Sequence, residues 1–168
     1  VFVLLSVESK IYTEASGATA AMPGRAGDLR VVAEDFSAVG ASNFRSTTLT
    51  GAATGAVELT ARSGLTLSGL SGIATQPLGS GDAGTIRVEA GSAVLDQGGT
   101  IISEAGMEQG SPGSVTLVVA GPIRVSGVGV NSEGENSPSQ ISTRVVNADS
   151  ESDAGDISIR AGSLELLD

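Results

Sequence analysis

The chain has no cysteine, histidine or tryptophan, and its only aromatic residues are one tyrosine and three phenylalanines. The absence of cysteine excludes disulfide bridges and zinc sites built on thiolates. Without histidine and cysteine, the commonest general base and the thiol nucleophile of enzymes are missing. Because Val, Ile, Leu and Ala replace aromatic rings as the apolar residues, the composition favours thin layers of β-strands over a globular core.

Positive charge is also scarce, since nine Lys and Arg residues stand against nineteen Asp and Glu residues, giving a formal net charge of −10. Without a basic stripe, a nucleic-acid partner is not expected, and binding to anionic lipid headgroups is disfavoured. The apolar run at residues 1–5 is too short to span a bilayer and lacks the pattern of a signal peptide. Because the chain does not begin with Met, we interpret residues 1–168 as one segment cut at both ends from a longer protein.

Glycine, by contrast, is abundant with 24 residues, and five of the glycines mark a repeat. The first four are 28 or 29 residues apart, and the last interval is 42 residues. A repeat of this length is typical of solenoid proteins, so we interpret these glycines as anchors of the turns between repeated units. The predicted turn anchors are Gly27, Gly55, Gly84, Gly113 and Gly155.

Apolar and polar residues alternate with a period of two after each anchor, which is the pattern of a β-strand with one buried face. The residues two and four positions after the glycine are aliphatic in all five units. We therefore predict that they stack in the core as two columns. The first column is Leu29, Val57, Ile86, Val115 and Ile157, and the second is Val31, Leu59, Val88, Leu117 and Ile159.

Two further short strands follow in each unit. Apolar pairs that begin at Phe36, Leu65, Ala93, Ile123 and Leu164 mark one of them, and Ile11, Phe44, Ile73, Ile101 and Ile141 mark the other. No stretch keeps the 3.6-residue period of an amphipathic helix. The sequence therefore predicts an all-β fold, a right-handed single-stranded parallel β-helix with about 29 residues and three short strands per rung.

The longer last interval indicates an insertion near residues 127–140, which are polar and rich in glycine. Loops that leave a rigid scaffold often carry binding, but such loops are also tolerated as mobile excursions without a function. The sequence leaves both interpretations open.

Oxygen-bearing side chains recur just before the last anchor, at Asp149, Glu151, Asp153 and Asp156 together with Asn147. Calcium prefers several oxygen ligands, whereas runs of acidic residues are usually solvated. The segment lacks the glycine of an EF-hand loop, so we prefer a solvated charge run and keep calcium as the alternative. No cofactor is predicted: residues 79–84 match the dinucleotide-binding glycine pattern, but a strand follows them instead of a helix.

Residues 81–92 and 152–164 share the order Asp-Ala-Gly, alternating aliphatic residues, and then Ala-Gly-Ser. These segments resemble repeats of filamentous haemagglutinin-like exoproteins, and among them the large cyanobacterial members of two-partner secretion systems. The resemblance implies secretion through an outer-membrane pore and a location on the exterior of the Gram-negative outer membrane. It further implies adhesion to a host cell, a neighbouring cell or a glycan surface, and it implies neither an enzyme nor a membrane span.

A second function stays open, because many parallel β-helices process or bind polysaccharides. Glycoside cleavage needs two carboxylates a few ångströms apart. The predicted outward acids are instead scattered among the repeats, at Glu58, Glu89, Asp96 and Glu104. Aromatic platforms for sugar rings are limited to Phe2, Tyr12, Phe36 and Phe44. The sequence therefore favours a structural and adhesive role over a polysaccharide-processing enzyme or a carbohydrate-binding module.

Overall fold

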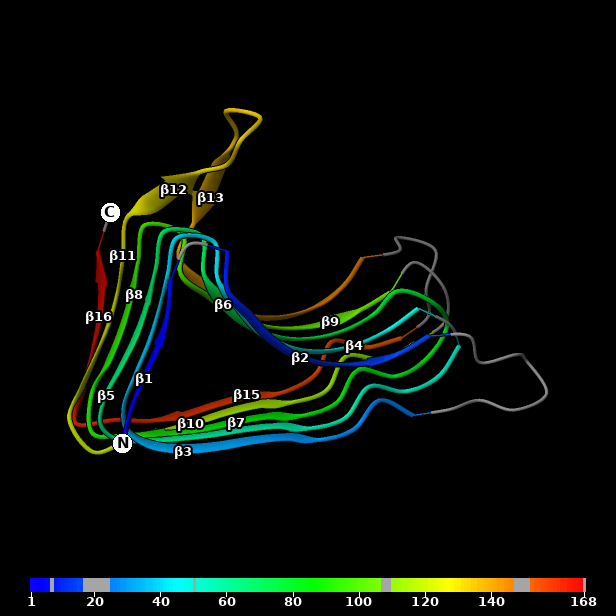
Figure 1. The fold of residues 1–168 in the computed structure, drawn as a ribbon, viewed down its shortest axis with the longest axis horizontal. Helices are drawn as coiled ribbons and strands as arrows, with labels where there is room; N and C mark the ends of the chain where they lie inside the picture. The colour runs from blue at the N-terminus through cyan, green and yellow to red at the C-terminus, as the bar shows by residue number, and fades with distance from the viewer. Residues whose placement is uncertain (7, 17–24, 50, 107–109, 147–151, 168) are drawn as a thin grey trace.

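The computed structural model describes residues 1–168 except 7, 17–24, 50, 107–109, 147–151 and 168. The described residues form strands, turns and extended segments, and they contain no helix. Parallel strands stack in about four turns of roughly 29 residues, which confirms the predicted parallel β-helix (Figure 1). Each turn is called a rung below. A rung alone would leave its strand edges and its apolar residues exposed to water, and the neighbouring rungs cover them.

Three faces surround the core when the molecule is viewed down its axis, as in Figure 1. The first face is made of the first parts of β3 (Leu29–Val39) and β5 (Val57–Ser68), then β7 (Ile86–Ala90), β10 (Val115–Val119) and β15 (Ile157–Arg160). The second is made of β1 (Phe2–Leu5), the second parts of β3 and β5, β8 (Ala93–Asp96), β11 (Pro122–Ser126) and β16 (Ser163–Leu167). The third is made of β2 (Lys10–Ala15), β4 (Asn43–Thr48), β6 (Gly72–Pro77), β9 (Thr100–Ala105) and β14 (Gln140–Val145).

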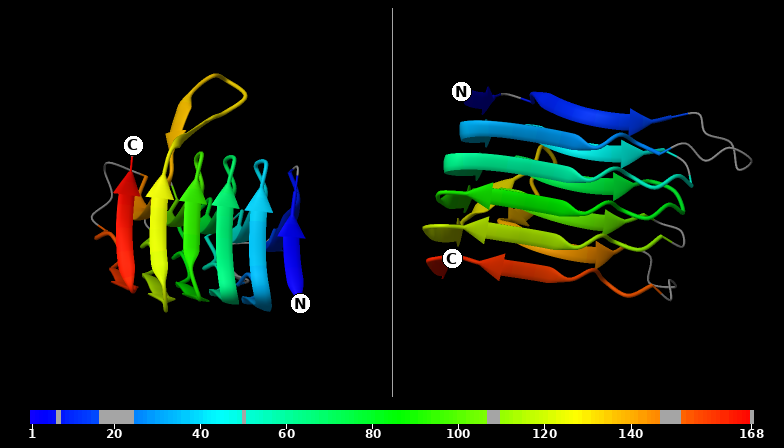
Figure 2. Two further views of the ribbon diagram at one scale, coloured as in Figure 1. Left: turned by 90° about the vertical axis from the view of Figure 1, so that its left-hand side faces the viewer. Right: turned by 90° about the horizontal axis from the view of Figure 1, so that it is seen from below.

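The first corner lies between the first and second faces, and β3 and β5 pass through it without a break. Two predicted short strands are therefore one bent strand in these rungs. The register between them shifts after Ala33, because β5 has one residue more at the bend. Seen from outside the second face, the strands point up while successive rungs move to the left, which is the right-handed sense (Figure 2).

The second corner, between the second and third faces, turns through left-handed backbone. Consecutive residues with positive φ occur there in three rungs, at Gly40–Ala41, Gly69–Leu70 and Gln97–Gly98. One residue of each pair is glycine, which adopts this conformation without the steric cost paid by other residues. Hydrogen bonds between rungs continue through the corner, since the Ala41 N–H donates to the Gly69 carbonyl at 2.6 Å.

The inward aliphatic residues of the first face lie directly above one another. The register places Ile86 between Val57 and Val115, and Val88 between Leu59 and Leu117. These six side chains are at most 1% exposed. Burying each of them stabilises the fold by about 1.5–3 kcal/mol relative to exposure to water. Leu29 and Val31, at the start of the two columns, pack against this core and are partly buried.

The far ends of both columns differ from the prediction. Ile157 and Ile159 keep the register opposite Val115 and Leu117, but they are 45% and 38% exposed. No described strand lies beyond β15, so no rung covers the surface that these side chains present. The prediction that all ten column residues are buried is therefore wrong for these two.

Candidate functional site

A β-hairpin leaves the stack at the second corner, where β11 would otherwise lead into β14 (Figures 1 and 2). It consists of β12 (Val128–Val130) and β13 (Asn136–Pro138), which pair in antiparallel orientation. Residues 127–139 connect β11 to β14, whereas residues 97–99 make the same connection between β8 and β9. The predicted insertion therefore lies at the second corner, where thirteen residues make a connection that takes three residues in the preceding rung.

The tip of the hairpin is closed by the side chain of Asn131. Its Oδ1 accepts hydrogen bonds from the N–H groups of Glu133 at 3.0 Å and Glu135 at 2.8 Å, and its Nδ2 donates to Glu135 Oε2 at 3.0 Å. Gly134 supplies the left-handed residue of the turn, with φ of +82°. The insertion is therefore a regular hairpin, and its Asn and Gly between short alternating runs were the available sequence signal.

One side of the hairpin packs on the turns of preceding rungs. A Cβ atom on Gly129 would lie 2.5 Å from the Gln97 carbonyl oxygen and 2.5 Å from Leu70 Cδ2, so only glycine can occupy this position. Ser139, at the base, accepts a hydrogen bond from the Gly98 N–H at 3.0 Å through its Oγ. These contacts fix the direction in which the hairpin projects.

The other side of the hairpin is apolar and open to solvent. Val128 and Val130 are 50% and 60% exposed, and Pro138 lies exposed across from Val128. A hollow of about 320 Å³ continues from the hairpin base toward β16. Glu133 and Glu135 add two carboxylates at the tip. The hairpin thus presents a small apolar surface with an acidic end.

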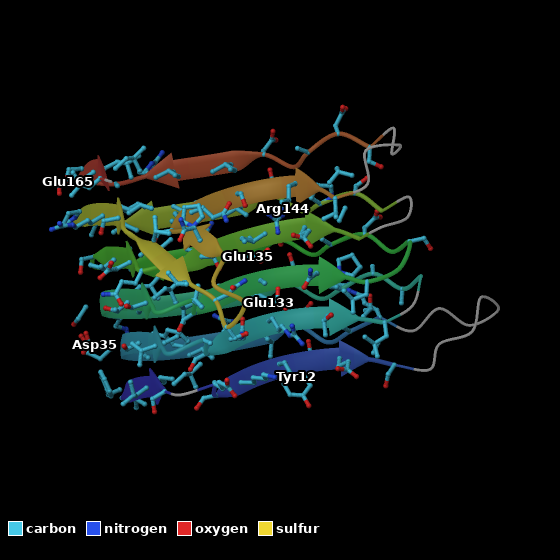
Figure 3. The ribbon with its side chains drawn as sticks, turned by 90° about the horizontal axis from the view of Figure 1, so that it is seen from above. Tyr12, Asp35, Glu133, Glu135, Arg144 and Glu165 are labelled. Atoms are coloured by element: carbon cyan, nitrogen blue, oxygen red, sulfur yellow. The ribbon has the colours of Figure 1, made fainter. Side chains whose placement is uncertain are left out.

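The outer surface of the third face is concave, and the hairpin stands at one edge of it (Figures 1 and 3). The central outward row along this surface contains Tyr12, Arg45, Ala74, Ile102 and Ser142. Tyr12 is 54% exposed. Two polar atoms of the row, Arg45 Nε and Ser142 Oγ, are buried without a hydrogen-bond partner. The row therefore combines an accessible aromatic ring with polar groups whose hydrogen-bonding capacity is unused.

Of the four predicted outward acids, only Glu58 and Glu89 come together. Glu104, 7% exposed on the third face, accepts a hydrogen bond from Gln76 Nε2 at 2.6 Å and is bound by the guanidinium of Arg144. Glu58 and Glu89 lie on the first face, each beside an arginine, and Asp96 lies on the second face. Glu58 and Glu89 line one small pocket of about 120 Å³ on the first face, and each of these two carboxylates is paired there with an arginine.

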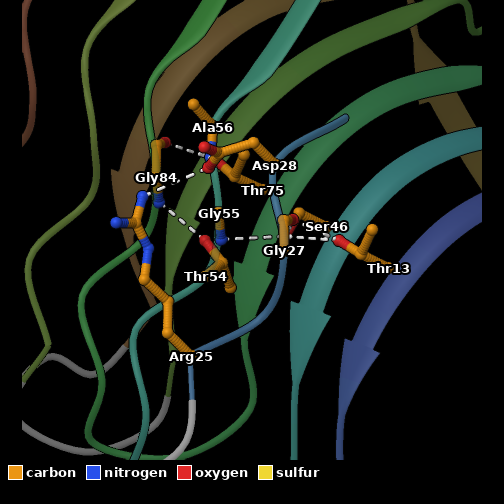
Figure 4. Close-up of polar contacts among 10 residues, drawn as sticks. All are labelled: Thr13, Arg25, Gly27, Asp28, Ser46, Thr54, Gly55, Ala56, Thr75 and Gly84. Carbon is orange, nitrogen blue, oxygen red and sulfur yellow. Dashed lines mark hydrogen bonds and ion pairs between the residues drawn. The ribbon is translucent and has the colours of Figure 1, made fainter. Parts of the chain in front are cut away.

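The five anchor glycines form a column where the chain enters the first face, and Figure 4 shows the first three of them. None has a positive φ, so a left-handed turn is not the reason for glycine, and in the last four of them close packing of rungs is the reason. A Cβ atom on Gly55, Gly84, Gly113 or Gly155 would lie 2.2, 2.1, 2.2 or 2.4 Å from the carbonyl oxygen of the preceding anchor.

A row of hydroxyl groups on the inner side of the third face hydrogen-bonds to this glycine column (Figure 4). Its members are Thr13, Ser46, Thr75, Ser103 and Thr143. The threonines donate to the carbonyls of Gly27, Gly84 and Gly155 at 2.6, 2.8 and 2.6 Å, and the serines accept from the N–H groups of Gly55 and Gly113 at 2.9 and 2.8 Å. These bonds satisfy backbone groups that close packing removes from water.

The hydroxyl row was missed by sequence reasoning. The available signal was a Ser or Thr two residues after the apolar residue that marks each third strand, in all five copies. Because side chains alternate along a strand, this position lies on the inner side of the sheet. A hydroxyl group that recurs there in every repeat indicates that it hydrogen-bonds to buried polar groups.

Only part of the predicted calcium segment is described. Asn147, Asp149 and Glu151 lie outside the described residues, and Asp153 and Asp156 are exposed. Among the described residues, no group of three or more His, Cys, Asp or Glu side chains is arranged to hold a metal ion.

Comparison with family models, with curated proteins and with solved structures finds no match for this chain. The part of the chain that the structure describes has no helix with the length and apolar character needed to cross a bilayer. Function is therefore inferred from the fold, from the hairpin and from the concave third face.

Proposed function

We propose that this chain is a segment of a secreted bacterial surface exoprotein, a β-helical stalk that mediates adhesive contact at the cell surface. The resemblance of residues 81–92 and 152–164 to repeats of filamentous haemagglutinin-like exoproteins supports this proposal. A two-partner outer-membrane pore would then deliver the chain to the exterior of a Gram-negative cell, with no catalytic role for the chain itself. The observation that carries the proposal is the continuous parallel pairing of successive rungs combined with an ordered, projecting hairpin.

A stalk must keep its shape, and the bonding between rungs supports that requirement. Parallel ladders join successive rungs on all three faces. Hydrogen bonds also continue at the entry to the first face, where the Ile86 N–H donates to the Ser114 carbonyl and the Val115 N–H donates to the Asp156 carbonyl, at 2.9 and 2.8 Å. Because these bonds run along the axis, bending the rod would break many of them together.

The contact surface of the stalk is the hairpin. Its apolar side exposes Val128 and Val130 on an element held away from the rod. Binding residues are commonly found on loops that a rigid scaffold positions. The two glutamates at the tip favour a partner surface that carries positive charge.

Bead adhesion tests this proposal. Beads coated with the purified chain are passed over a panel of bacterial, host-cell and glycan-coated surfaces, and the retained fraction is counted under flow. In one variant, residues 127–139 are replaced by the Gln-Gly-Gly turn of the preceding rung, and in a second Val128 and Val130 are both changed to Ser. Val32→Ser is the matched control, because Val32 is a 46% exposed valine on the first face.

We expect wild-type and Val32→Ser beads to be retained on at least one surface, and both hairpin variants to lose most of that retention. Circular dichroism and the melting temperature report whether each variant keeps its fold. Retention of folded beads without the hairpin, equal to wild type, would show that this hairpin is not the adhesive element. No retention of wild-type beads on any surface would contradict adhesion itself.

A carbohydrate-binding or polysaccharide-processing role is the second candidate, favoured by the concave third face with its exposed Tyr12. An aromatic ring on a concave sheet can stack on sugar rings. A glycan array and a reducing-sugar assay, run on wild type and Tyr12→Ala, test this role. Glycan binding that Tyr12→Ala abolishes would favour a binding module, and sugar release would favour an enzyme.

A further inference from the structure

A trough crosses the first corner of the β-helix on its outer side, with a volume of about 600 Å³, over β5, β7, β10 and β15. The second face separates it from the hairpin. Its floor contains Gly91, Ala120 and Gly162. A Cβ atom on Gly91 would lie 2.4 Å from the Arg62 carbonyl oxygen, so rung packing requires a glycine here. The three floor residues therefore carry no side chain larger than a methyl group.

Arg62 and Arg160 line this trough, one in the rung of β5 and the other in the rung of β15. Three rung steps separate them, which is about 14 Å along the axis at roughly 4.8 Å per step. Both side chains are exposed. Neither guanidinium forms an ion pair or a hydrogen bond with another described residue. Two cations at a fixed spacing are thus available to a ligand.

Two of the carboxylates around the trough are paired with arginines, and Glu34, in the rung before Arg62, accepts a hydrogen bond from Ser63 Oγ at 2.7 Å. Glu89 lies in the trough wall with its Oε1 2.5 Å from Arg87 Nη2, and Glu58 Oε2 lies 3.6 Å from Arg30 Nε. Acids farther away contribute little, because the Debye length is about 8 Å at physiological salt. Among the residues that line the trough, Arg62 and Arg160 are therefore cations without a paired carboxylate, in a chain whose net charge is −10.

We propose that this trough binds an acidic polysaccharide, whose carboxylate or sulfate groups pair with Arg62 and Arg160. Guanidinium groups bind such anions through two parallel hydrogen bonds. Because the two arginines are three rungs apart, they match charges that recur along one extended chain better than they match a single small anion. The small residues of the floor leave room for the sugar rings between them. This inference does not depend on the stalk function.

A nucleic acid suits the trough less well. Its affinity rests on many phosphate contacts, typically six to ten, whereas the trough offers two unpaired cations. Single strands also need aromatic side chains on which bases stack, and none lines the trough. A glycan with more widely spaced charges and no need for stacking is the better match.

Isothermal titration calorimetry at low salt tests the proposal with four probes: polygalacturonate fragments, dextran sulfate, uncharged dextran and oligothymidylate. We expect both anionic glycans to bind and dextran not to bind. Arg62→Ala and Arg160→Ala should each weaken binding about tenfold, as expected for loss of one charge-assisted contact, and the double variant should lose it. Arg124→Ala is the matched control, since Arg124 is an exposed arginine on the second face outside the trough.

The outcomes separate the alternatives. The anionic glycan that binds more tightly identifies carboxylate or sulfate as the preferred group. The proposal fails if neither anionic glycan binds wild type, or if Arg124→Ala weakens binding as much as the trough variants do. Oligothymidylate binding as tightly as the glycans would show that the ligand class is wrong. Melting curves of the variants should match wild type, because all three side chains are exposed.

Discussion

The inner sides of the first and third faces share one rung spacing but differ in chemistry. On the first face, Val57, Ile86 and Val115 form an aliphatic stack whose members differ in size and shape. On the third face, Thr75 and Ser103 form part of a hydroxyl row that bonds to the backbone of the anchor glycines. The first stack depends on apolar character and volume, whereas the second depends on particular atoms at particular positions.

This difference predicts how each region tolerates change. An aliphatic column can exchange one aliphatic residue for another at small cost, because nondirectional packing holds it together. The glycine column and its hydroxyl row cannot, because a methyl group meets backbone and a lost hydroxyl removes the closer of two donors to a carbonyl such as that of Gly84. Four substitutions test the comparison.

The largest effect is expected from Ile86→Asp, which places a carboxylate in the middle of the aliphatic column. Ile86 is 1% exposed, so the charge would be buried without a partner, and the free energy of unfolding should fall by about 4 kcal/mol or more. Urea unfolding followed by circular dichroism measures the change. Val32→Asp, at an exposed valine of the same face, should change it by less than about 0.5 kcal/mol. Equal stability of the two variants would overturn the inward placement of Ile86.

The next effect tests the glycine column, with Gly84→Ala compared against Gly27→Ala. The new methyl at residue 84 would lie 2.1 Å from the Gly55 carbonyl oxygen, so the rungs must separate, at an expected cost of about 3 kcal/mol. At residue 27 the nearest atom is Thr13 Cγ2 at 3.7 Å, an ordinary contact. Urea midpoints should therefore drop for Gly84→Ala only. A similar drop for both would mean that glycine flexibility, and not rung contact, decides these positions.

A smaller effect is expected from Thr75→Val, which keeps the side-chain shape and removes the hydroxyl. The Gly84 carbonyl would lose its closer donor, at 2.8 Å, and keep the Ser103 hydroxyl at 3.3 Å, so the free energy of unfolding should fall by about 1–2 kcal/mol. Thr116→Val, at an outward position of β10, is the control and should be near neutral. If Thr75→Val were as stable as wild type, the hydroxyl row would have no role in holding the rungs.

The sequence predicted the first face more completely than the third for a physical reason. Aliphatic alternation repeats in every unit, so the period, the strands and the partners of Ile86 followed directly from it. The role of Gly84 could not be predicted in this way. A glycine that is required by close contact between two backbones looks the same in the sequence as a glycine that is required by a turn. The hairpin position followed from the longer interval, but the closure of its tip by Asn131 depends on hydrogen bonds within the loop. The trough could not be foreseen, since the small residues and arginines that form it come from different rungs.

The smallest effect sharpens the comparison, because Ile86→Val removes one methylene from the aliphatic column and no polar contact. The expected loss of unfolding free energy is about 1 kcal/mol, within the usual range for this change. Val already occupies the equivalent positions above and below, at Val57 and Val115, so a third valine suits the stack geometry. Thr75→Val changes a hydroxyl to a methyl with almost no change in volume. If Ile86→Val cost clearly more than Thr75→Val in the same urea titration, volume would limit this core more than hydrogen bonding, and the third face would be the more tolerant of the two.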